Sequence, residues 1–142
     1  MTIKETAGKV LLYFYQLQRT VPLEMQYRQL GFIEKKNVGV SLTSDKKWLT
    51  NDLLDINPSS VDIFNAFMYL LDKGYVKSSE RGGSGAKVFM GVNLGTSGID
   101  IVEGVERGED GINSFKKAFN ISPAGDATVD SLIKDTLSAL MN

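Results

Sequence analysis

The chain has 142 residues, of which 42% are hydrophobic and 23% charged, and 16 Lys and Arg against 17 Asp and Glu give a formal net charge of -1. This composition is typical of one soluble globular domain that is large enough to bury a hydrophobic core. The sequence has no cysteine and no histidine, which excludes thiol chemistry, Cys/His zinc sites and histidine-based catalytic triads, so we expect no metal, no cofactor and no enzymatic activity.

The sequence contains no apolar stretch of about 20 residues, and its first residues, Met1-Thr2-Ile3-Lys4-Glu5, lack an apolar signal region. We therefore expect a cytoplasmic protein with no membrane partner. Charge is distributed unevenly, because residues 1–93 hold 12 Lys and Arg against 9 Asp and Glu, whereas residues 94–142 hold 4 against 8. This asymmetry is mild, and it falls short of the dense basic surface common in nucleic-acid-binding domains.

The first half of the chain predicts helices with one short strand among them. Residues 6–19 form the pattern of an amphipathic helix, with an apolar stripe of Val10, Leu11, Phe14 and Leu17. A second helix is expected at 22–30, because Pro22 suits a first helical position and Gly31 suits a helix end. Residues 38–43 alternate in the manner of a strand, and Ser44 or Asp45 is expected to cap a helix that runs through Leu54.

The sharpest punctuation in the sequence is Asn57-Pro58-Ser59-Ser60, which combines a capping side chain with a proline suited to a first helical position. It predicts a helix that runs to Lys73 and ends at Gly74. Two strands, 75–80 and 87–93, are then expected to form a hairpin with a glycine-rich tip at 81–86. A short helix is expected after Thr96.

The remaining residues predict a hinge followed by an appendage. Residues 104–111 are polar with glycines at intervals, which is typical of a hinge. Residues 115–121 are expected to form a last strand, and residues 129–141 a last amphipathic helix. We therefore expect a main domain at 1–103, the hinge at 104–111 and a C-terminal appendage at 112–142. An apolar stripe on the last helix needs a partner surface, which is either a second copy in a homodimer, the reading we favour, or the same chain. This stripe contains Leu132, Ile133, Leu137 and Leu140.

The predicted order of helix, strand, helix, tight turn, helix and glycine-tipped hairpin resembles the winged helix-turn-helix. The segment from Leu49-Thr50-Asn51-Asp52 through Asn57-Pro58-Ser59-Ser60 to Leu70-Leu71-Asp72-Lys73-Gly74-Tyr75-Val76 is similar to the turn and recognition helix of bacterial winged-helix regulators, and residues 94–103 resemble the return from their wing. Residues 98–109 and 129–134 resemble parts of small proteins of Gram-positive phages and prophages. The resemblance implies an α+β, mainly helical fold and a DNA-binding transcriptional regulator of phage or mobile-element origin.

In DNA-binding members of this family, the third helix lies in the major groove of double-stranded DNA. Carried onto this sequence, the groove-facing residues are Ser59, Ser60, Asn65 and Tyr69, and the wing residues are Lys77, Arg81 and Lys87. Asn65 suits adenine recognition and Tyr69 a phosphate contact. For the wing, the alternative is an ordinary solvated hairpin without DNA contacts. Four further lysines could contact phosphates, and the alternative is that they only increase solubility; they are Lys35, Lys36, Lys46 and Lys47.

Phe64 and Met68 do not suit a groove-facing position, and Asp62 and Asp72 add negative charge to the same helix. Either this second apolar stripe is covered by other parts of the chain, or it docks on another protein. The latter predicts a non-enzymatic protein-interaction module on a winged-helix scaffold. An enzyme is a third hypothesis without a motif, because residues 82–87 lack the spacing of a phosphate loop.

Overall fold

The structure is a computed structural model that describes residues 2–20, 28–33, 38–42, 45–47, 60–78, 80–82, 86–90, 92–123 and 127–141. The described helices are α1 (Ile3–Thr20), α3 (Ser60–Asp72), α4 (Thr96–Glu103), the 3-10 helix η2 (Gly104–Arg107), α5 (Glu109–Ala118) and α6 (Ala127–Met141). The described strands are β1 (Arg28–Ile33), β2 (Val38–Leu42), β3 (Asp45–Lys47), β4 (Val76–Lys77), β5 (Glu80–Gly82), β6 (Ala86–Met90) and β7 (Asn93–Leu94). The expected mainly helical α+β class is confirmed.

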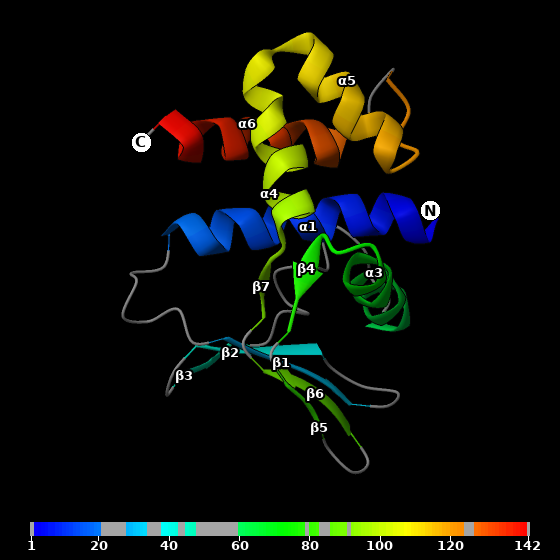
Figure 1. The fold of residues 1–142 in the computed structure, drawn as a ribbon, viewed down its shortest axis with the longest axis vertical. Helices are drawn as coiled ribbons and strands as arrows, with labels where there is room; N and C mark the ends of the chain where they lie inside the picture. Colours follow the sequence, from blue (N-terminus) through cyan, green and yellow to red (C-terminus); the bar gives the residue numbers. More distant parts are fainter. Residues whose placement is uncertain are drawn as a thin grey trace.

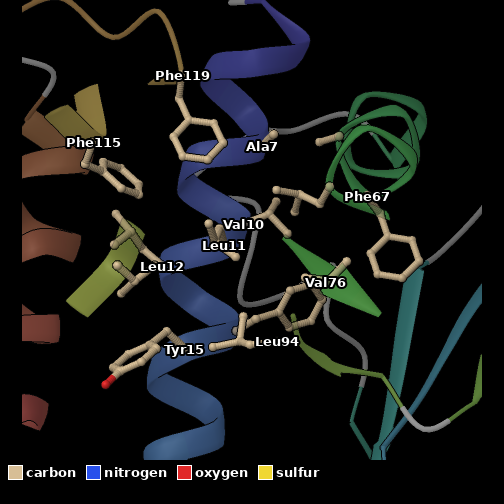
Figure 2. Packing of buried hydrophobic residues seen from close by; sticks show 14 of the residues in the cluster. Ala7, Val10, Leu11, Leu12, Tyr15, Phe67, Val76, Leu94, Phe115 and Phe119 are labelled. Atoms are coloured by element: carbon tan, nitrogen blue, oxygen red, sulfur yellow. The ribbon is translucent and has the colours of Figure 1, made fainter. Parts of the chain in front are cut away.

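Helix α1 confirms the first predicted helix and lies in the middle of the fold, between α3 and α6 (Figure 1). It begins with a local cap, because the Glu5 backbone N–H donates to Thr2 Oγ1 at 3.2 Å. Its side chains are buried in two directions. Figure 2 shows Leu12 and Tyr15 on the side towards α4 and α6, with Phe67 of α3 across the helix. Because α1 is buried on both sides, it joins the layer that contains α3 to the layer that contains α4 and α6.

The strands form two antiparallel sheets. The larger has the order β3-β2-β1-β6-β5, and the smaller pairs β4 with β7. The expected strand at 38–43 is confirmed as β2, and the expected hairpin is confirmed in part. Its base is the β4–β7 pair, its distal part is the β5–β6 pair, and the central residues of its tip, 83–85, lie outside the described residues. The return strand β6 also pairs with β1, so the hairpin is continuous with the sheet of the N-terminal half.

Two expected helices of the N-terminal half are wrong where the structure describes them. Residues 28–30 belong to strand β1, and Gly31, expected to end a helix, lies inside that strand opposite Gly39. Residues 45–47 form strand β3 rather than the first turn of a helix. Sheet pairing explains both errors, since β1 lies between β2 and the distant β6, and β3 pairs with β2. Ladder hydrogen bonds override local helix signals. Residues 22–27 and 48–59 lie outside the described residues.

The helix predicted to follow Asn57-Pro58 and to end at Gly74 is confirmed as α3 over its described residues, and the last two predicted helices are confirmed as well. Helix α3 ends as expected, with Gly74 in the left-handed conformation at φ 76°. The short helix after Thr96 is α4, and the last helix is α6.

The expected hinge at 104–111 and the expected strand at 115–121 are wrong. Residues 104–107 form η2, and α5 follows directly from 109 to 118. Gly111 lies against the carbonyl oxygen of Gly104, so close that a Cβ would overlap it. This glycine therefore permits tight packing of η2 on α5 and does not signal flexibility. The division of the chain into domains at this point stays a prediction.

One hydrophobic cluster unites the helices. The tilted rings of Phe115 and Phe119 pack at 4.9 Å between centroids, and the Phe119 ring lies 5.2 Å from the ring of Tyr75, which follows α3. Phe119 also covers Gly8 of α1. Buried residues of α1, α3, α4, α5 and α6 thus belong to the same cluster.

Candidate functional site

The candidate site is built on α3 and on the hairpin that follows it. Asn65 and Tyr69 lie four residues apart on α3, hence on one side of the helix, and both side chains are half-buried. Ser60 is the first residue of α3, and Ser59 lies outside the described residues. The structure therefore brings two of the four predicted groove residues, Asn65 and Tyr69, together with part of each side chain at the surface.

Phe64 and Met68 form a second pair on α3, also four residues apart. Both are half-buried and pack against the hydrophobic cluster. The covered part of each side chain agrees with the explanation that α3 is central. The exposed part leaves apolar surface beside Asn65 and Tyr69, so the alternative of a docking surface stays open.

The hairpin places two of its predicted basic residues together. Arg81 lies opposite Phe89 in the β5–β6 register, and Lys87 precedes Phe89 by two residues on β6. The two basic residues therefore lie on paired strands, two positions apart in the β5–β6 register. Lys77 is exposed but belongs to the two-stranded base, so it stands apart from the distal pair.

The connection between α3 and the hairpin is short and closely packed. Gly74 turns the chain, the Tyr75 backbone N–H donates to the Leu70 carbonyl at 2.9 Å, and the Tyr75 carbonyl accepts from the Gly95 N–H at 2.9 Å. A Cβ on Gly95 would overlap the Gly74 carbonyl oxygen, and one on Gly98 would overlap the Tyr75 carbonyl oxygen. Only glycine allows this approach of α4 and β7 to the end of α3.

The predicted self-association stripe lies mostly against its own chain. Ile133 is 4% exposed and belongs to the core, and Leu132, Leu137 and Leu140 are half-buried against it. Polar contacts add to this docking, because Gln16 Nε2 donates to the Leu132 carbonyl at 3.0 Å. The alternative of docking on the same chain therefore describes α6, and Ile133 is not available to a second copy. The homodimer stays a prediction without this support.

Two polar pairs, each with one buried and one exposed member, were not predicted from the sequence. The Tyr15 hydroxyl donates to Glu103 Oε2 at 2.6 Å, and burial followed by this hydrogen bond raises the pKa of Tyr15 above its usual range. Lys116 Nζ lies 2.9 Å from Asp130 Oδ1, and the lysine side chain is only 8% exposed. A polar residue inside an apolar helical stripe is the one sequence signal for such pairs, and it does not identify the partner. Both pairs join helices, so we assign them to the scaffold.

Among the residues that the structure describes, no group of three or more Asp and Glu side chains is placed to hold a metal ion. None of the described helices is both long and apolar enough to cross a membrane. Comparison of the chain with protein-family models, curated proteins and solved structures finds no significant match.

Proposed function

We propose that the protein binds double-stranded DNA in the manner of a winged-helix regulator, with α3 at the major groove and the β5–β6 hairpin as the wing. One observation supports the proposal above all. A helix with a half-exposed polar pair, Asn65 and Tyr69, is joined by a closely packed turn to a hairpin whose paired strands contain Arg81 and Lys87. An amide for a base edge and cations for phosphates are the groups that DNA recognition needs.

Although Asp62 and Asp72 lie on α3 itself, a larger group of carboxylates lies away from the proposed DNA surface. Asp100, Glu103, Glu106, Glu109 and Asp110 are all exposed on the segment from α4 to α5. Figure 1 shows η2 and α5 on the far side of α1 from the five-stranded sheet. A duplex that approaches the hairpin therefore keeps most of these carboxylates at a distance, where salt screens their repulsion.

The test is fluorescence anisotropy with random duplex DNA at two salt concentrations, about 50 mM and 200 mM, on wild type and three variants. Each phosphate contact contributes about a 3.5-fold loss of affinity between these concentrations. We expect Arg81→Ala and Lys87→Ala each to weaken binding and to reduce the salt dependence by about that factor. Lys134→Ala on the exposed side of α6 removes the same charge elsewhere and is the matched control, expected to behave as wild type.

An unchanged salt dependence in both hairpin variants would refute the wing role. Absence of binding by the wild type even at about 50 mM salt, where electrostatic affinity is strongest, would refute DNA binding as a whole.

The half-buried Phe64 and Met68 favour one second candidate, a protein-interaction module that docks a partner through α3. For this function, Phe64→Ala and Met68→Ala should abolish a complex while the melting temperature stays within a few degrees of wild type. A large fall in melting temperature in both variants would instead assign the pair to the core, where such truncations cost roughly 2–5 kcal/mol.

A further inference from the structure

Two glutamines of α1 reach into opposite layers of the fold. Gln16 Nε2 donates to the Leu132 carbonyl at 3.0 Å and to Thr136 Oγ1 at 3.1 Å, both on α6. Gln18 Oε1 accepts from the Leu94 backbone N–H at 3.2 Å, on β7. Residues two apart on a helix point about 200° apart around its axis. Gln16 therefore forms hydrogen bonds with the C-terminal helix, and Gln18 forms one with the hairpin on the other side of α1.

Leu94 is the point at which the hairpin returns to the body of the protein. It pairs with Val76 in the β4–β7 ladder, and the two side chains are 3% and 2% exposed. Both strands of the hairpin leave and enter through this pair. Because β4 begins four residues after α3 ends, any tilt of the β4–β7 pair changes the direction of the hairpin relative to α3.

The hydrogen bond from the Leu94 N–H to Gln18 connects the Val76–Leu94 pair to α1, which is not part of the hairpin. Beyond this pair, β6 is tied to β1 over five residue pairs, which fixes the distal hairpin on the sheet of the N-terminal half. The β4–β7 ladder itself is only two residues long on each strand, and a ladder of that length is marginal on its own, so contacts outside it hold this end of the hairpin against α3. The Gly95–Tyr75 hydrogen bond fixes the same end from the side of α3. Gln18 fixes it from the side of α1, so β7 is anchored to both helices.

We propose that Gln18 is a positioning residue that holds the hairpin at a fixed direction relative to α3 and thereby sets the discrimination between a specific DNA site and other duplexes. The second half of this inference rests on the proposed function. Sequence-specific binding requires α3 and the hairpin to fit one duplex together, whereas unspecific binding requires phosphate contacts alone. Gln18 carries no charge and its hydrogen bond is to the Leu94 backbone, so its loss should lower specificity and leave the salt dependence unchanged.

The first experiment follows hydrogen exchange of the Leu94 amide in the full chain without DNA. Gln18→Met keeps the length of the side chain and removes the acceptor, Gln18→Glu restores an oxygen acceptor, and Gln16→Met is the matched control on the other side of α1. We expect Gln18→Met to accelerate exchange about 2- to 10-fold, which corresponds to the loss of one hydrogen bond. We expect the two other variants to exchange at the wild-type rate.

The second experiment measures affinity for a duplex selected from a random pool by the wild type and for a scrambled duplex of the same composition. We expect Gln18→Met to lower the ratio of the two affinities about 2- to 10-fold, with the salt dependence unchanged and the ratio restored in Gln18→Glu. Unchanged Leu94 exchange in Gln18→Met, or an equal loss of specificity in Gln16→Met, would overturn the inference. If the wild type binds no DNA, the proposed function fails, and the exchange comparison still decides whether Gln18 holds the hairpin.

Discussion

Replacement of Gly98 by alanine tests the closest backbone contact at the base of the hairpin. Gly98 is a buried residue of α4 whose missing side chain leaves room for the Tyr75 carbonyl oxygen. In an ordinary helix this substitution stabilises, because alanine exceeds glycine in helix propensity by about 1 kcal/mol. Here a Cβ would overlap a backbone atom, and a backbone atom cannot move aside as a flexible side chain does.

The sign of the effect follows from these two contributions. Overpacking in a well-packed interior costs about 1–3 kcal/mol when neighbours yield, and more when they cannot. Because the Tyr75 carbonyl cannot yield, the cost exceeds about 3 kcal/mol, and after the gain in propensity we expect Gly98→Ala to lower the free energy of unfolding by at least about 2 kcal/mol. For a chain of this length that corresponds to a fall in melting temperature of roughly 4–8 °C.

Gly104→Ala is the matched control for the assay, which is thermal and urea unfolding followed by circular dichroism. Gly104 also has a helical conformation, but its Cβ would meet the far end of the Arg107 side chain, with Nη2 at 2.7 Å. Since that end is free to rotate away, we expect no loss of stability and a gain of up to about 1 kcal/mol. Gly98→Ala as stable as Gly104→Ala would refute the contact between α4 and Tyr75.

Three further predictions concern the scaffold. Burial and Glu103 raise the pKa of Tyr15 above its usual value near 10, so as the pH rises the unfolded chain loses the Tyr15 proton before the folded chain does. The contribution of Tyr15 to the free energy of unfolding is therefore complete below about pH 10 and falls above it. In urea titrations at several pH values, Tyr15→Phe should reduce that fall. Asp130→Asn leaves the nearly buried Lys116 ammonium without its carboxylate and should lower the free energy of unfolding by about 1–3 kcal/mol. Lys116→Met removes the charge itself and should lower it by less, and equal losses in the two variants would contradict this explanation. Phe119→Ala should cost about 3–5 kcal/mol in the same titrations because the ring is fully buried, and a loss below about 1 kcal/mol would contradict its place in the core.

The sequence predicted the elements whose local signals agree with their tertiary contacts. Helix α3 has a capping residue before it, a continuous apolar stripe, and Gly74 at its end. Strand β2 shows strict alternation, and α6 has an apolar stripe without glycine or proline. In each case periodicity and punctuation lead to the same assignment, so no distant contact was needed to find them.

The elements that were mispredicted depend on contacts between distant residues. Phe115 and Phe119 are spaced for one side of a helix, and acidic residues open α5 while lysines close it. Those signals were outweighed by Gly108 and Gly111, which resemble a linker until the packing of Gly111 on the Gly104 carbonyl is known. In the candidate site, Asn65 and Tyr69 were predicted by carrying the winged-helix resemblance onto this sequence, whereas Gln18 was not predicted, because its partner is a backbone N–H 76 residues away.

The central place of α1 has a consequence for synthesis of the chain. One side of this helix is completed by α3, and the other by α6, whose contact with Gln16 spans 116 residues. At a translation rate of about 5–20 residues per second, α1 waits roughly 6–25 s with an apolar side uncovered. The side of α1 that α6 covers is therefore completed later in synthesis than the side that α3 covers.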